Sequence, residues 1–155
     1  MAQTNHRRLA VAIVTAYIAD MVFNMLYHGH LVMDAYVQTS ELWRSEAEMQ
    51  SLLGYCYLGH LILVTIGGVI FSRGYEGKGY LEGFRFGLLL GLVMAAQTLV
   101  SYTYLPLPNF ILSVFLLGNL LEGVVIGVFL SIAYTIKLDA EKPAKKTKAK
   151  AAKKK

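Results

Sequence analysis

The chain has 155 residues, of which 55% are hydrophobic and only 16% are charged, and its mean hydropathy is +0.48. A soluble domain of this length carries more charge and interrupts its apolar runs more often, so the composition favours one compact membrane-embedded unit. The net charge of +5 comes from residues 137–155, which hold nine lysines, and the single cysteine, Cys56, excludes an internal disulfide.

Four apolar stretches are long enough to cross about 30 Å of hydrocarbon, which takes roughly 20 helical residues. They cover residues 9–31, 52–71, 83–104 and 109–136. Helices satisfy the backbone of such stretches in lipid, and the alternation of a barrel strand is absent from the sequence. The first stretch is too long for a signal peptide, so we read it as a retained span. The sequence therefore predicts an all-α membrane protein with four transmembrane helices in an antiparallel bundle.

The basic residues between the spans predict the orientation of the chain. Residues 1–8 contain two arginines, the connection around residues 72–82 contains Arg73 and Lys78, and the tail over 137–155 is lysine-rich. By contrast, the connection over 32–51 has one base against four acids, and that over 105–108 has no charge. We therefore expect both termini in the cytoplasm. The tail is predicted to be disordered and to contact anionic lipid, at about 1 kcal/mol per lysine near the surface, rather than nucleic acid.

Glycines recur every four residues in the last two spans. The third span contains Gly83, Gly87 and Gly91, and the fourth contains Gly123 and Gly127. Residues at this spacing lie on one helix face, where glycine lets a second backbone approach closely. These faces are predicted to pack either within the four-helix bundle or against another subunit, so we expect a homo-oligomer or other membrane subunits as partners.

Polar side chains also recur inside the predicted spans, where they are costly in lipid and usually face the protein interior. Three share one face of the first span at four-residue intervals, one lies in the second span, and two lie in the fourth. Together they form a predicted buried polar site: Asp20, Asn24, His28, His60, Asn119 and Glu122.

Three interpretations of this site are open from the sequence. The polar groups can be interhelical hydrogen-bond partners with a purely structural role. They can form a path for a proton, a cation or a small solute. They can also hold a metal or haem, for which the candidate ligands are His28, His30 and His60. No GxSxG, HExxH or CxxC motif is present in the sequence, so we expect no cofactor as the simplest case and more readily a non-enzyme.

Several short runs resemble an uncharacterised family of small bacterial four-span integral membrane proteins. The runs are Tyr27-His28-Gly29 with Leu31 and Tyr36, Leu42-Trp43-Arg44, Glu48-Met49, residues 74–79, residues 82–87, and Glu122-Gly123. The similarity covers residues from about 10 to 136. It implies a bacterial membrane protein and implies no activity.

The sequence thus supports a leading hypothesis and two rivals. The leading hypothesis is a small inner-membrane protein that binds or conducts a small solute, proton or cation through the buried polar site. The first rival is an accessory or scaffold subunit of a larger membrane complex. The second is a haem- or metal-binding electron-transfer subunit.

Overall fold

The structure, a computed structural model, describes residues 5–136, and every regular element among these residues is a helix or a helical turn. The predictions for residues 1–4 and for the tail over 137–155 lie outside the described residues. The helices are α1 (His6–Leu26), α2 (Met33–Val37), α3 (Glu46–Gly74), α4 (Tyr80–Tyr102) and α5 (Asn109–Thr135). A π-helical turn, η1 (Tyr27–Leu31), continues α1, and a 3-10 turn, η2 (Ser40–Leu42), precedes α3. The predicted all-α fold is confirmed.

Four helical segments are long and apolar enough to cross a membrane, as the sequence predicted. They are α1 with η1, α3, α4 and α5, with lengths of 23 to 29 residues and mean hydropathies of 1.6 to 2.1. Only 17–33% of the most apolar window of each segment is buried inside the molecule. Most of the apolar surface therefore faces outward, which suits lipid and not water.

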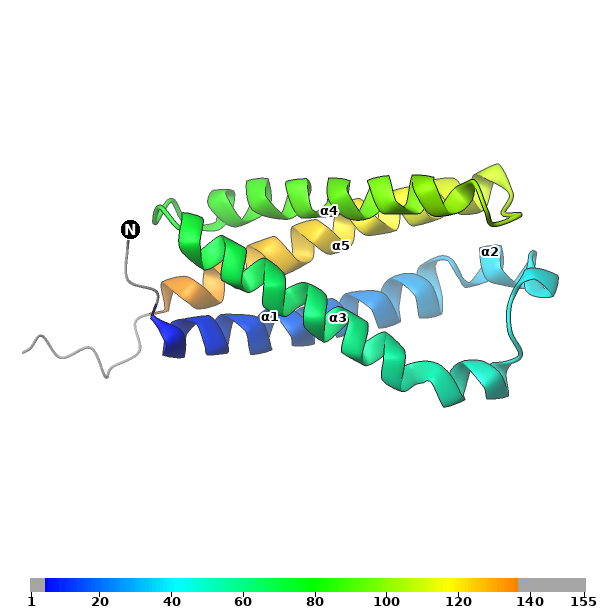
Figure 1. The fold of residues 1–155 in the computed structure, drawn as a ribbon, viewed down its shortest axis with the longest axis horizontal. Helices are drawn as coiled ribbons and strands as arrows, with labels where there is room; N and C mark the ends of the chain where they lie inside the picture. Colours follow the sequence, from blue (N-terminus) through cyan, green and yellow to red (C-terminus); the bar gives the residue numbers. More distant parts are fainter. Residues whose placement is uncertain (1–4, 137–155) are drawn as a thin grey trace, which may run out of the picture.

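The two ends of the molecule hold different connections (Figure 1). At one end lie the start of α1 and the turn between α3 and α4; we call it the amino-terminal end. At the other lie α2 and the turn between α4 and α5; we call it the α2 end.

The helices α4 and α5 lie side by side along their lengths, and their glycines make this contact possible (Figure 1). A Cβ added at Gly91 would lie 2.7 Å from the carbonyl oxygen of Asn119, and one at Gly87 would overlap the backbone of Gly123. A Cβ at Gly83 would likewise overlap Gly127. The glycines of the two spans thus face each other within the chain, where the two backbones touch.

A second contact joins α1, α3 and α5 near the amino-terminal end. Its core is a cluster of small, aliphatic and aromatic side chains: Ala12, Ala16, Val64, Phe71, Ile126, Leu130, Ala133 and Tyr134. Figure 1 shows α3 crossing the other helices obliquely. Only its second half, from Val64 onward, supplies buried residues, whereas every residue over 46–59 is exposed.

The start of α3 differs from the predicted start at residue 52 because of a capping motif. The hydroxyl of Ser45 accepts from the backbone N–H of Glu48, and the Glu48 carboxylate accepts from the backbone N–H of Ser45. This reciprocal pair satisfies two donors that a helix start otherwise leaves open, so the helix begins at Glu46. Because the helix starts at Glu46, its midpoint falls at His60.

Candidate functional site

Three of the predicted polar residues lie at the middle of three different helices. His60 is fourteen residues from each end of α3, and Glu122 is thirteen residues from each end of α5. Asp20 lies near the middle of the 26-residue segment formed by α1 and η1. The three side chains therefore lie at one level of the molecule, which would be close to the centre of a membrane that these segments span.

Asp20 is fully buried, and both of its carboxylate oxygens accept hydrogen bonds. The Nδ1 atom of His60 donates to Oδ2 at 2.9 Å, which joins α3 to α1. The side-chain amide of Asn24, one turn along α1, donates to Oδ1 at 3.0 Å and to the Asp20 carbonyl oxygen at the same distance. The four-residue spacing of Asp20 and Asn24 makes this local support possible.

Glu122 brings a second carboxylate to the same histidine but is held differently. Its Oε1 atom lies 3.2 Å from Nδ1 of His60, within ion-pair distance. That oxygen is buried and accepts no hydrogen bond from any residue over 5–136, whereas the same Nδ1 atom is in hydrogen-bond geometry with Asp20. A buried carboxylate oxygen without a hydrogen bond is rare and costly.

The donor atoms of Asp20, His60 and Glu122 all lie within 4.8 Å of one another. We call these three residues the central cluster. It holds two carboxylates against at most one positive charge, so it has one negative charge too many when both carboxylates are ionised. At this depth that charge is expensive unless a cation neutralises it.

A polar cavity of about 440 Å³ adjoins the central cluster. Its lining comes from all four long helices: Asn24, His28, Tyr55, Cys56, Gly59, His60, Leu63, Met94, Asn119 and Glu122. Except for Leu63, three residues past the midpoint of α3, these residues lie in the half of their helix nearer the α2 end or at the midpoint. The exposed α3 residues Tyr55, Cys56 and Gly59 leave the cavity open to the surface. A small ion or molecule could therefore reach the cluster from this half of the protein.

The predicted site residues His28, Asn119 and His30 do not belong to the central cluster. His28 lines the cavity and is paired with the hydroxyl of Tyr36, 2.6 Å from its Nδ1 atom. Asn119 also lines the cavity, but its amide donates to the hydroxyl of Thr98 on α4 at 2.7 Å. His30 is exposed on η1 and, within the described chain, is not part of the cavity lining. The structure therefore gathers one histidine with two carboxylates and does not gather the three histidines.

The π-helical turn η1 positions His28 at the rim of the cavity. Its extra residue per turn is marked by the hydrogen bond from the Val32 N–H to the Tyr27 carbonyl oxygen, at 3.0 Å. Such turns are uncommon and occur frequently at functional sites. The buried Tyr27 anchors the turn by donating to the Val114 carbonyl oxygen at 2.8 Å, in space left by Gly118.

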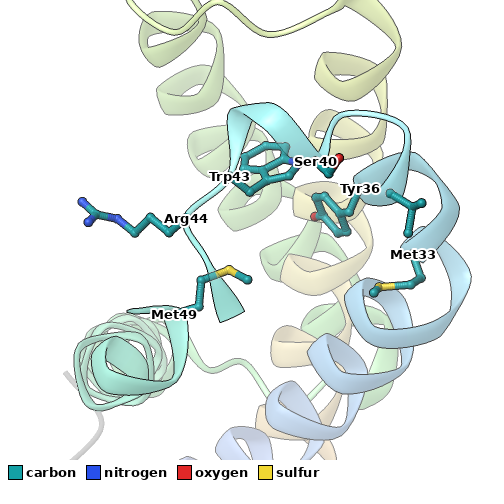
Figure 2. Close-up of a pocket in the computed structure, with 7 residues that line it drawn as sticks. Met33, Tyr36, Ser40, Trp43, Arg44 and Met49 are labelled. Carbon is teal, nitrogen blue, oxygen red and sulfur yellow. The ribbon is translucent and has the colours of Figure 1, made fainter. Parts of the chain in front are cut away.

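An apolar pocket of about 340 Å³ lies beyond this rim, at the α2 end (Figure 2). Its labelled lining includes the rings of Tyr36 and Trp43, which meet edge to face with centroids 5.4 Å apart. Arg44 extends away from the other labelled side chains in Figure 2. Burial, with a smaller contribution from Tyr27, raises the pKa of Tyr36 to about 12. Tyr36 thus remains a neutral hydroxyl that separates this pocket from His28 and the polar cavity.

Two partners of the predicted residues were missed in the sequence. Thr98 lies four residues from the end of α4 and Asn119 ten residues from the start of α5, so their positions along the sequence did not indicate that the two side chains are hydrogen-bonded. Tyr36 lies in the connection over residues 32–51, and nothing local in the sequence marks it as the partner of His28.

Comparisons with protein-family models, with curated proteins and with solved structures found no match.

Proposed function

We propose that this chain is a small multi-pass membrane protein that binds a small cation at the central cluster of Asp20, His60 and Glu122. The observation that carries the proposal is the Oε1 atom of Glu122, which is buried without a hydrogen bond within the described residues. The neighbouring Nδ1 atom of His60, 3.2 Å away, is hydrogen-bonded to Asp20. A cation placed there would satisfy this oxygen and neutralise the surplus negative charge.

The packing around the cluster supports access from one side. The polar cavity extends from the cluster toward the α2 end. Toward the amino-terminal end, the space between α1, α3 and α5 is filled by the core that includes Ala16, Val64 and Ile126. We propose that the cation enters through the cavity, and that release to the opposite side would require this core to open.

The distribution of charge supports an orientation for this access. We propose an antiparallel four-helix arrangement in the inner membrane of a bacterium, with both termini in the cytoplasm, as the positive-inside rule favours. The described connections agree with that rule, since Arg73 lies in the last turn of α3 and Lys78 lies in the turn that follows it, at the amino-terminal end. In this orientation the cavity opens on the outer half of the membrane.

Equilibrium dialysis of the purified full chain in detergent tests the proposal. Wild type, Asp20→Asn and Glu122→Gln would each be equilibrated with Na⁺, K⁺, Mg²⁺, Mn²⁺ and Zn²⁺ in turn, with Glu41→Gln as the matched control. We expect at least one cation to bind wild type and the control at one equivalent per chain, and to bind both cluster variants more weakly. Binding of none of them, or binding that ignores the cluster variants, would overturn the proposal.

A second candidate function is supported by the first half of α3. Every residue over 46–59 is exposed, and Gly54 and Gly59 have open space at their Cβ positions among the described residues. Small residues on an exposed helix favour helix association in lipid. A role as a subunit that docks a second copy through this half of α3 predicts that Gly54→Cys, in a Cys56→Ser background, forms a disulfide-linked dimer in membranes. A chain that stays monomeric under oxidation would argue against it.

A further inference from the structure

We infer that the central cluster is built for a divalent transition-metal ion of the Zn²⁺ or Mn²⁺ type, held by Nδ1 of His60 and one carboxylate oxygen each from Asp20 and Glu122. This inference rests on the proposed cation-binding function and names its ligand class. Three separate observations carry it: the spacing of the donor atoms, their charge and their chemical type.

The spacing of the donor atoms suits a shared metal ion. Nδ1 of His60 lies 2.9 Å from the Asp20 oxygen and 3.2 Å from the Glu122 oxygen, and all three donors lie within 4.8 Å of one another. Donors bonded to one zinc ion at about 2.0–2.2 Å, with angles of about 90–110°, lie about 2.8–3.6 Å apart. The two distances to Nδ1 fall in that range, so those donors could bind without moving apart.

The charge of the cluster selects a divalent ion. Asp20 and Glu122 together supply two negative charges when ionised, and a neutral imidazole supplies none. When the ion binds Nδ1 of His60, it replaces the proton on that atom, and the proton leaves to solvent through the cavity. A divalent ion then makes the loaded cluster neutral, whereas a monovalent ion on the same three atoms leaves a net negative charge near the centre of the membrane. Neutrality matters most for groups buried as completely as Asp20 and Glu122, which are 0% and 5% exposed.

The donor types select among divalent ions. Mg²⁺ and Ca²⁺ prefer oxygen donors throughout, whereas the imidazole nitrogen suits Zn²⁺ and the two carboxylates also suit Mn²⁺. One histidine with two carboxylates is a mixed nitrogen and oxygen set. Cys56, one helical turn from His60, lines the cavity and is not among the three donors.

The cavity leaves a coordination position open. Glu122 and His60 both line it, and the His60 side chain is 19% exposed. Three protein ligands with an open fourth position characterise exchangeable and reactive metal sites, whereas purely structural zinc sites are closed by four. Asn24 and Asn119 also line the cavity, where their polar groups can contact water on the ion.

Titration of the metal-stripped full chain with Zn²⁺ and separately with Mn²⁺ tests the inference. Isothermal titration calorimetry would compare wild type with Asp20→Asn, Glu122→Gln and His60→Gln, and with His30→Gln as a control that removes an exposed histidine. Co²⁺ would serve as a second probe, since its visible bands report nitrogen and oxygen ligation directly. Size exclusion and thermal melting would establish that each variant is folded.

We expect one equivalent of Zn²⁺ per chain for wild type and for His30→Gln. A lost ligand should weaken binding by more than the about 10–100-fold that a lost outer-sphere partner costs, so each cluster variant should fall beyond that range. If Asp20→Asn fails to fold, Glu122→Gln and His60→Gln decide the result. Folded wild type that binds no Zn²⁺ or Mn²⁺, or binds it equally well in the cluster variants, would overturn the inference. Cluster-dependent binding of Na⁺, K⁺ or Mg²⁺ alone would overturn it while leaving the proposed cation-binding function intact.

Discussion

The Oε1 atom of Glu122 lies 3.2 Å from Nδ1 of His60 yet accepts no hydrogen bond within residues 5–136. The same nitrogen donates to Asp20 at 2.9 Å. The two carboxylates of the central cluster are therefore not equivalent. Asp20 holds α1 and α3 together, whereas Glu122 contributes charge and an available oxygen.

This difference predicts unequal effects of mutation on stability. Asp20→Ala removes the acceptor of both His60 and Asn24, and breaking a buried charged pair costs about 3–5 kcal/mol. Glu122→Gln removes no hydrogen bond formed within the described chain and also removes the surplus negative charge of the metal-free cluster, so the free energy of unfolding should fall by less than about 1 kcal/mol or should rise. Reversible unfolding of the metal-free protein in mixed detergent micelles would measure both values. Equal losses for the two variants would contradict the asymmetry.

The glycine contact between α4 and α5 predicts intolerance to a single methyl group. Gly123→Ala would place a Cβ against the backbone of Gly87 and Gly91, which cannot yield as a side chain can. We expect a loss of at least about 1–3 kcal/mol, the usual cost of overpacking. Gly54→Ala is the matched control, because open space surrounds that position in the described structure and alanine favours a helix by up to about 1 kcal/mol. Comparable melting temperatures for the two variants would show that α4 and α5 do not touch at their glycines.

The burial of Tyr36 predicts that the stability of the protein depends on pH. The pKa of Tyr36 is raised from the usual 10 to about 12, chiefly by burial, so the folded state favours the neutral hydroxyl. The stability that Tyr36 contributes should be fully present below pH 10 and should be lost as pH rises toward 12. The difference in unfolding free energy between wild type and Tyr36→Phe should therefore shrink over this interval. A difference that is constant from pH 9 to 12 would show that Tyr36 is not buried against His28.

The proposed orientation predicts the labelling of single cysteines. In a Cys56→Ser background, Glu41→Cys should react with a membrane-impermeant maleimide added to intact cells, because its connection is expected outside. Lys78→Cys should react only after the membrane is permeabilised. Both positions are exposed, so burial does not explain a difference between them. Reaction of Lys78→Cys alone from the outside would reverse the orientation.

The sequence predicted the helices well because their signals are local. Length and hydropathy define a membrane-spanning helix regardless of its neighbours, so the four segments could be found from composition alone. The extension of α3 to Glu46 was also local, through the Ser45–Glu48 capping pair, but the polar residues beside it hid the helix start. The short helix α2 and the turn η1 carry no such signal, because packing of Tyr27 and Tyr36 against other helices sets their geometry.

The site could be foreseen only in part, because helical spacing fixes faces and not partners. The interval between Asp20 and Asn24 predicted a shared face, and these two side chains are hydrogen-bonded. Which carboxylate would receive the His60 proton depends on how α3 crosses α1 and α5, which no spacing within one helix reveals. Asn119 shows the same limit, since its amide is bonded to Thr98 of α4.

The position of a bound cation tests the central claim most directly. Anomalous scattering from crystals of the full chain, equilibrated with Zn²⁺ and separately with Tl⁺ as a heavy monovalent ion, would locate it without assuming its charge. We predict a peak for at least one ion among Nδ1 of His60 and the carboxylates of Asp20 and Glu122, and for Zn²⁺ at bond lengths of about 2.0–2.2 Å. Well-ordered crystals in which both ions lie only on surface loops would contradict the account.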